Sequence, residues 1–119
     1  MNLKVKEMTL THSEPFHFLE FRHGPMSMVN ENAVVIGMLS DANLSHEKAV
    51  LNEMQALGGK IVALAESNAD VSFKSQIPEQ VRAVLYLPAL QLMAYHRSLV
   101  KGLDPDRPNN LTAVIKLDL

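Results

Sequence analysis

Two continuous apolar segments constrain the fold of this chain most strongly. They are residues 33–39 (AVVIGML) and 60–65 (KIVALA), each of strand length and without regular alternation of apolar and polar residues. Such a run is typical of a strand covered on both faces, as in a parallel sheet. Residues 46–57 between them predict a helix that ends at Gly58-Gly59 in a left-handed C-cap. The order strand, helix, strand indicates an α/β fold in which a parallel sheet lies between two helical layers.

Helix-breaking and helix-capping residues predict the remaining elements. We expect a helix over residues 3–18 with Pro15 as its kink or stop, and Ser45 as the N-cap of the helix at 46–57. A long helix over 79–101 is predicted to break at Pro88 and to stop at Gly102. Residues 22–29 predict a turn or a one-turn helix, and residues 71–77 a weaker strand near an edge.

The length of the chain suits one domain. Its 119 residues are 47% hydrophobic, which is ordinary for a globular protein and too apolar for a disordered one. We therefore expect residues 1–119 to form a single domain, with residues 103–119 packing over the functional site or onto a partner. A helix at residue 3 with no strand before it predicts an αβα sandwich that is incomplete at its N-terminus. The apolar surface or sheet edge left uncovered predicts a homodimer.

Composition argues against several classes of protein. With 11 basic and 13 acidic residues, the chain has no basic footprint for nucleic acid. No apolar run approaches the roughly 18 residues of a membrane span, and residues 1–6 are too polar for a signal peptide. There is no cysteine, and His12, His17 and His23 lack the spacing of a metal cluster. We expect a cytoplasmic protein that uses no metal or cofactor and binds neither membrane nor nucleic acid.

The side chains best suited to catalysis lie near the N-terminus. Four polar residues recur at spacings of three, four and three, and so share one face of a helix: Lys4, Glu7, Thr11 and Glu14. His23 precedes Gly24-Pro25, a pair that ends regular structure and fixes an imidazole at a turn. A carboxylate, an ammonium and an imidazole suit acid–base catalysis. The alternative is a solvated helix face and a histidine that packs or caps a loop.

Three separated motifs, in this order, resemble the SIS (sugar isomerase) family. They are LKVKEMTLTHSE at 3–14, EFRHGPMSM at 20–28 and LQLMAYHRSLVKGLDPDRPNNLTAV at 90–114. The likeness is closest to the second half of the isomerase domain of glucosamine-6-phosphate synthase and to related aminosugar-phosphate isomerases and deaminases. The resemblance implies a three-layer αβα sandwich of SIS type, which is flavodoxin-like, and a sugar-phosphate substrate.

The resemblance also implies catalytic roles. Glu7 matches the base that carries a proton between C1 and C2 of the sugar, and Lys4 matches the lysine that helps to handle the enediol oxygens. His23 matches the histidine that opens the sugar ring, which in the family reaches the site of a neighbouring subunit. A dimer would then be the catalytic unit.

The C-terminal segment departs from the family pattern. Asn110, Leu111 and Thr112 resemble the segment that folds over the sugar, but Ala113 stands where the amidotransferase has a lysine that forms an imine with the ketose. Because alanine has no amine, an isomerase or deaminase fits better than glutamine-dependent synthesis.

The family's phosphate cradle lies in the preceding half of the domain, at a helix N-terminus rich in serine and threonine. Here the candidates near a strand end are Ser40 and Ser45, and Ser45 is interpreted as a helix cap. We therefore expect a first SIS half to supply the phosphate site and the isolated chain to be weak or inactive. Two alternatives stay open, a non-catalytic sugar-phosphate sensor and an assembly module whose truncated sheet pairs with another chain.

Overall fold

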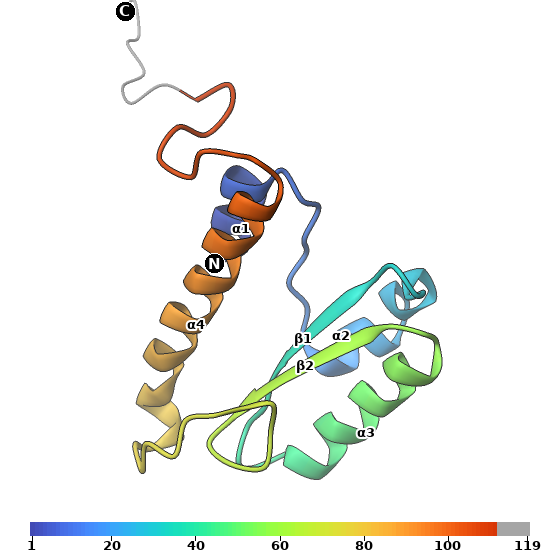
Figure 1. Cartoon of the computed structure of the whole chain (residues 1–119). Helices are drawn as coiled ribbons and strands as arrows, with labels where there is room; N and C mark the ends of the chain where they lie inside the picture. The colour runs from blue at the N-terminus through green and yellow to red at the C-terminus, as the bar shows by residue number, and fades with distance from the viewer. Residues whose placement is uncertain (112–119) are drawn as a thin grey trace, which may run out of the picture. The chain divides into compact units, whose positions relative to one another are not determined.

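The computed structural model describes residues 1–111, which form two compact units. Of the described residues, the first unit contains 1–15 and 87–111, and the second contains 16–86. The longest helix, α4 (Glu79–Val100), contributes residues to both (Figure 1). The prediction of one domain over residues 1–119 stays a prediction.

The second unit is built on a parallel sheet. Strands β1 (Val34–Met38), β2 (Lys60–Ala65) and β3 (Val71–Ser72) lie in the order β1-β2-β3, and both pairings are parallel. The register places Val34 opposite Lys60 and Met38 opposite Leu64. The predicted α/β fold with a parallel sheet is confirmed, because the two apolar segments form the adjacent strands β1 and β2.

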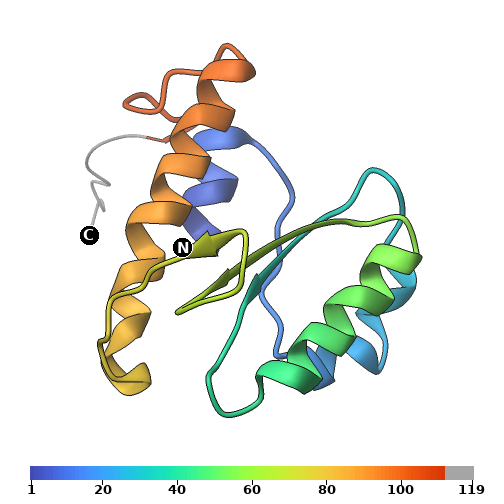
Figure 2. The same cartoon turned by 60° about the horizontal axis from the view of Figure 1, so that its bottom comes forward.

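One face of this sheet carries the core of the second unit. The helices α2 (Phe18–Arg22) and α3 (Leu44–Ala56) lie on that face (Figure 2), and a one-turn 3-10 helix, η1 (Pro25–Met28), follows α2. Leu39, Leu51 and Ala65 form the buried centre of the core. The half-buried residues that pack against it are Phe18, Val35, Leu44, Ile61, Ala63 and Ala69. The strand residues among them are odd-numbered, as expected for side chains that share one face of a strand.

Gly58 ends α3 in the conformation that the sequence predicts. Its φ of 96° lies in the region that favours glycine, and a Cβ added there would lie 3.3 Å from the backbone nitrogen of Glu31.

We expect Gly58→Ala to lower the free energy of unfolding by about 1–2 kcal/mol, measured by urea denaturation. Gly24→Ala is the control, because its Cβ would meet nothing within 4 Å. An equal loss in both variants would contradict a conformational role for Gly58.

The first unit is formed by α1 (Asn2–Thr9) and the second half of α4. Three small residues of these helices are 0% exposed, namely Thr9, Ala94 and Ser98. The Lys101 ammonium donates to the carbonyl oxygens of Thr9 at 2.6 Å and Leu10 at 3.1 Å. A cation at the C-terminal end of a helix satisfies carbonyl groups that have no intrahelical partner and interacts favourably with the helix dipole. This contact fixes the end of α1 against the residues that follow α4.

Two predicted features of the helices are wrong. The helix predicted to reach residue 18 ends at Thr9, because Leu10 adopts a left-handed conformation with a φ of 47°. Thr11 and Glu14 therefore do not continue the helical stripe of Lys4 and Glu7. Conversely, α4 runs through Pro88 without a break. A proline inside a helix removes one backbone hydrogen bond, and the turns on either side of Pro88 retain theirs.

Two smaller predictions also need correction. The N-cap of α3 is Asn43 rather than Ser45, because the N–H of Asn43 donates to Ser40 Oγ at 3.0 Å and the chain turns earlier. The strand predicted over 71–77 is limited to two residues, since Lys74 and Gln76 have positive φ values that end the pairing. Within the part of the chain that the structure describes, no helix is long and apolar enough to cross a membrane.

Candidate functional site

Lys4 and Glu7 lie one turn apart on α1. Lys4 is exposed and lines a groove of about 460 Å³ in the first unit. The other residues lining the groove are Met8, Pro88, Gln91, Leu92 and Tyr95. Glu7 is half-buried, and neither residue takes part in any ion pair within residues 1–111. The structure thus brings an ammonium and a carboxylate together on one helix, with their charges not used to hold the fold.

His23 occupies a turn, as its position before Gly24-Pro25 predicts. Its backbone N–H donates to the carbonyl oxygen of Glu20 at 3.2 Å, and η1 begins at Pro25. The side chain is exposed and forms no ion pair in the described part of the chain. His23 belongs to the second unit, whereas Lys4 and Glu7 belong to the first.

The predicted substrate-binding segment is only partly described. Asn110 and Leu111 are exposed, and Asn110 has a φ of 59°. Thr112 lies outside the described residues, as does Ala113. Their roles stay predictions.

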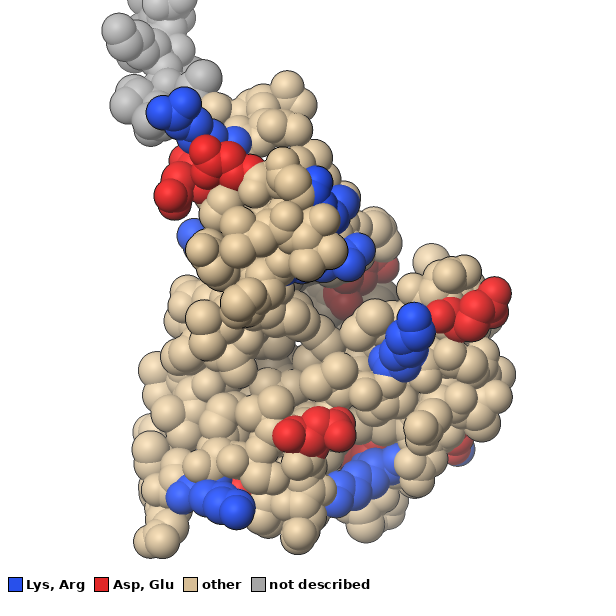
Figure 3. Space-filling model, in the orientation of Figure 1, with Lys and Arg blue, Asp and Glu red and all other residues tan. Residues whose placement is uncertain are grey.

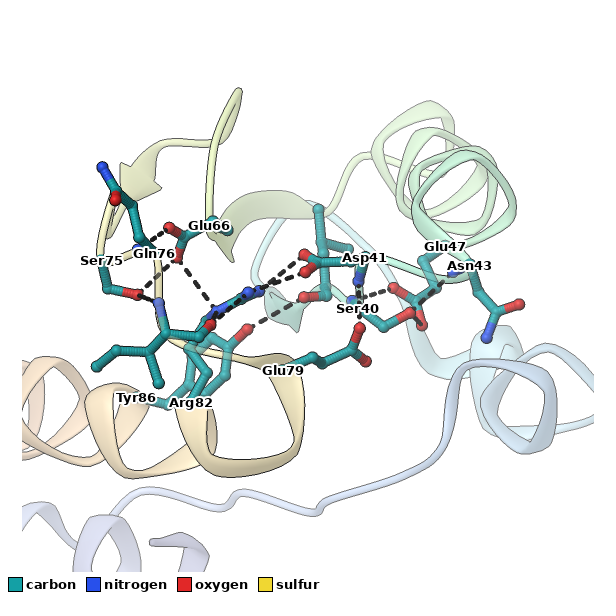
Figure 4. Close-up of polar contacts among 12 residues, drawn as sticks. Ser40, Asp41, Asn43, Glu47, Glu66, Ser75, Gln76, Glu79, Arg82 and Tyr86 are labelled. Atoms are coloured by element: carbon teal, nitrogen blue, oxygen red, sulfur yellow. Dashed lines mark hydrogen bonds and ion pairs between the residues drawn. The ribbon is translucent and has the colours of Figure 1, made fainter.

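A polar cluster that the sequence did not predict lies where β1 and β2 end (Figure 4). Its centre is Arg82, a residue that is 4% exposed and whose guanidinium donates to both carboxylate oxygens of Asp41, at 2.7 and 2.8 Å. Arg82 also donates to the carbonyl oxygen of Ile77 at 2.8 and 3.1 Å and lies 3.2 Å from Glu66. Each side of the guanidinium therefore faces an acceptor, and the cluster fixes the first turns of α4 to the ends of two strands.

The donor groups of the loop after β1 already form hydrogen bonds to carboxylates of this chain. The backbone N–H and hydroxyl of Ser40 donate to the two Glu47 carboxylate oxygens, at 2.6 and 2.9 Å. The N–H of Asp41 donates to Glu79 at 2.9 Å. A phosphate bound at this loop would have to displace both carboxylates. Ser40, one of the two serine candidates for a phosphate site, is thus engaged with Glu47.

The hydrogen bonds of the cluster shift the pKa values of its acids. The hydrogen bond from Arg82 lowers the pKa of the Asp41 carboxyl below its ordinary 3.8. The backbone N–H of Gln76, which donates at 2.6 Å, lowers the pKa of Glu66 below 4.5. The hydrogen bond to Asp41 raises the pKa of Arg82, and burial raises that of Tyr86, whose hydroxyl donates to the Leu39 carbonyl oxygen at 3.0 Å.

These shifts predict how stability depends on pH. Because the folded-state pKa values of Asp41 and Glu66 are lowered, their contribution is complete above about pH 4.5 and is lost as the pH falls through the lower folded values. We expect the urea midpoint to fall between pH 5 and pH 3, and to fall less in the Asp41→Asn/Glu66→Gln variant. An unchanged pH dependence in that variant would contradict the assignment, and Glu31→Gln is the control.

On the face drawn in Figure 3, Lys and Arg are interspersed with Asp and Glu and form no surface of a single sign. Within residues 1–111, no group of three or more His, Cys, Asp or Glu side chains is placed to hold a metal ion.

The sequence profile of the SIS domain matches residues 1–100. The chain belongs to the SIS family. It is 32% identical over 124 residues to the glutamine–fructose-6-phosphate aminotransferase of Pyrococcus horikoshii, and 34% identical over 125 residues to that of Acinetobacter baylyi. Each alignment covers 98% of this chain but only 21% and 20% of the relative. The chain thus spans about a fifth of the curated relatives that it matches.

Two solved structures of SIS-family proteins resemble the fold. Glucosamine-6-phosphate deaminase from Thermotoga maritima superposes with a TM-score of 0.80 and 28% identity, over 93% of this chain and 34% of that one. The C-terminal domain of the glucosamine-fructose-6-phosphate aminotransferase from Francisella tularensis gives 0.74 and 28%, over 89% and 32%. The SIS-type αβα fold is therefore confirmed for this chain.

Each part of the site was visible in the sequence to a different degree. Lys4, Glu7 and His23 were recognised through motifs. Asp41 and Glu66 each follow a predicted parallel strand. The carboxyl ends of such strands meet at one edge of the sheet, so the sequence pattern indicates that these two acids lie near one another. Arg82 gave none, because an arginine among alternating apolar and polar helix residues is ordinarily exposed.

Proposed function

We propose that this chain is the proton-transferring part of a phosphosugar isomerase or deaminase that acts on an aminosugar or ketose 6-phosphate. The observation that supports it most is the pair on α1, an exposed Lys4 and a half-buried Glu7 that no ion pair engages in the described residues. The chain belongs to the SIS family and resembles a glucosamine-6-phosphate deaminase in structure. A carboxylate free to exchange protons is what isomerisation between C1 and C2 requires.

In the proposed reaction, Glu7 removes the proton from C2 of the open-chain aldose. The electrons of the broken C–H bond form the C1–C2 double bond of an enediolate, and the C1 carbonyl oxygen takes up the negative charge. The proton of the C2 hydroxyl then passes to O1, and protonated Glu7 returns its proton to C1, which yields the ketose. The Lys4 ammonium stabilises the negative charge that develops on the sugar oxygens. His23 moves the proton on and off the ring oxygen. Each positioned acid or base contributes about 10²- to 10⁴-fold in rate.

The phosphate is proposed to bind to a part of the SIS fold outside this chain. The serine loop after β1 supports this, because Glu47 and Glu79 already accept from its N–H groups. A partner SIS half would supply the phosphate site. If His23 acts in the site of a neighbouring subunit, the chain must form a homodimer. This homodimer stays a prediction, and light scattering tests it.

Assays on glucosamine 6-phosphate and fructose 6-phosphate test the proposal. They compare this chain alone with this chain joined to the part of the T. maritima deaminase that it does not match. We expect little turnover from the chain alone and clear turnover from the joined form. Strong turnover by the chain alone would contradict the need for a partner half. Sugar-phosphate binding by the joined form without turnover would instead indicate a non-catalytic binding module.

A further inference from the structure

Helix α1 is short, although it carries both Lys4 and Glu7. It has eight residues, and isolated helices shorter than about 12–15 residues are only marginally stable in water. Within residues 1–111, no side chain caps its first turn, and the Ser13 hydroxyl that contacts Asn2 comes from the segment just after α1. Glu7 lies in the last turn of the helix. Its position therefore depends on what holds the C-terminal end of α1.

A lysine that follows α4 holds this end. The last carbonyl groups of a helix have no partner within the helix. The Lys101 ammonium donates to the carbonyl oxygens of Thr9 and Leu10, at 2.6 and 3.1 Å. Figure 1 and Figure 2 both show α1 beside the C-terminal part of α4. Lys101 thus supplies hydrogen-bond donors and a positive charge where α1 ends, and the charge also interacts favourably with the helix dipole.

The backbone of Lys101 is itself held by the end of α4. Its N–H donates to the carbonyl oxygens of Arg97 and Ser98, each at 3.1 Å. The N–H of Leu103 donates to Ser98 at 2.9 Å, and Gly102 between them has a φ of 68°, as in a left-handed C-cap. The ammonium therefore reaches α1 from a backbone that the end of α4 fixes.

The other polar contacts at this end of α1 are weaker links to α4. The Thr9 hydroxyl donates to Val5 at 2.6 Å, inside α1 itself. The Thr11 hydroxyl donates to the Thr9 carbonyl oxygen at 3.2 Å, but it is neutral and belongs to the segment just after α1. Arg97 donates to that hydroxyl at 2.9 Å, and so reaches the end of the helix only indirectly. Lys101 is the charged group that links the end of α1 directly to the residues after α4.

We propose that Lys101 is a positioning residue for the proposed reaction, because its ammonium holds the turn of α1 that carries the Glu7 carboxylate. The inference rests on the proposed function, since Glu7 acts as a base only in that reaction. A displacement of about 1 Å by a mutation far from the chemistry can lower a rate by about 10²-fold. Lys4 lies in the first turn of α1. Release of the C-terminal end should therefore disturb proton transfer more than substrate binding.

Amide hydrogen exchange of the full chain tests whether Lys101 holds α1. Lys101→Met removes the donors, and the Leu10 amide, which donates to Lys6 at 3.0 Å, should then exchange at least about tenfold faster. Lys48→Met is the matched control, since the Lys48 ammonium donates to the Asn68 carbonyl oxygen at 2.8 Å within the second unit. Exchange in α1 should not change in this control. Equal exchange of Leu10 in the wild type and in Lys101→Met would overturn the proposal.

Kinetics of the joined form test whether proton transfer depends on this contact. In Lys101→Met, kcat for glucosamine 6-phosphate should fall by about 10- to 100-fold while KM changes by less than about threefold. Lys101→Arg keeps the charge and the donors, and its kcat should lie within about threefold of the wild-type value. Lys48→Met should keep the wild-type kcat. The urea midpoint of each variant checks that it is folded in the assay.

The outcomes separate this inference from the proposed function. A fall in kcat of equal size in Lys48→Met, or no recovery in Lys101→Arg, would indicate a general loss of stability and overturn the positioning role. Wild-type kcat in Lys101→Met would overturn that role and leave the proposed function intact. A wild-type joined form without turnover contradicts the proposed function, and the exchange of the Leu10 amide then still decides whether Lys101 holds α1.

Discussion

Glu7→Gln is expected to lower the turnover of the joined form by about 10²- to 10⁴-fold while substrate binding changes little. Glutamine keeps the size and hydrogen-bonding capacity of the side chain but has no pKa in a range that allows it to take a proton from carbon. The carboxylate has no ion-pair partner within residues 1–111, so its loss should not destabilise the fold. The measurement is kcat and KM for fructose 6-phosphate and glucosamine 6-phosphate.

The control for this variant is Glu14→Gln. Glu14 was predicted to share the helical stripe of Glu7 but lies beyond the end of α1, where it pairs with His12 at 3.3 Å on the surface. Surface pairs of this kind contribute little to stability. We expect wild-type turnover from Glu14→Gln, and equal turnover in both variants would contradict the assignment of Glu7 as the base.

Arg82→Leu is expected to lower the melting temperature by roughly 5 °C or more. The substitution leaves the Asp41 carboxylate and the Ile77 carbonyl oxygen without the donor that lies 2.7–3.1 Å away. The Asp41 side chain is 53% exposed and can be solvated by water, so the loss of stability comes from the Ile77 carbonyl oxygen left without its donor and from the lost two-pronged ion pair. Differential scanning calorimetry or circular dichroism gives the melting temperature.

Arg97→Leu is the matched control, since Arg97 is an exposed arginine of the same helix with a single hydrogen bond to Thr11 Oγ1 at 2.9 Å. Its melting temperature should change by about 2 °C or less. Arg82→Lys should fall between the two, because lysine keeps the charge but not the two-pronged geometry. A loss in Arg97→Leu as large as that in Arg82→Leu would contradict a special role for the buried guanidinium.

The sheet was predictable because its signal is local. Two apolar segments of strand length, with a capped helix between them, leave few arrangements other than adjacent parallel strands, and β1 and β2 are paired in that way. Gly58 was predictable for a similar reason, since a left-handed C-cap strongly prefers glycine.

The limits of several helices were not predictable, because they depend on contacts far apart in sequence. Leu10 takes a left-handed conformation that costs free energy for a leucine, and Lys101 stabilises it by donating to its carbonyl oxygen and to that of Thr9. Pro88 is tolerated inside α4, although a proline in a helix normally costs stability. Neither outcome follows from the residues on either side in the sequence.

The candidate site also contains residues that a local sequence pattern indicates and residues that depend on contacts far apart in the sequence. The family motifs identified Lys4, Glu7 and His23, but no local pattern indicated that Arg82 would be buried between Asp41 and Glu66. That placement requires α4 to meet the ends of β1 and β2, which only the folded chain provides. Side chains that we propose to act on a substrate are thus easier to recognise from the sequence than those that hold the second unit together.

The central claim is that Glu7 carries hydrogen between C1 and C2 of a sugar phosphate. Fructose 6-phosphate incubated with the joined form in D₂O, and followed by proton NMR, tests this most directly. The account predicts that the wild-type form exchanges a C1 proton for deuterium and that Glu7→Gln does not, at equal substrate occupancy. Exchange at the wild-type rate in Glu7→Gln, or no exchange in a wild-type form that binds the sugar, would contradict it.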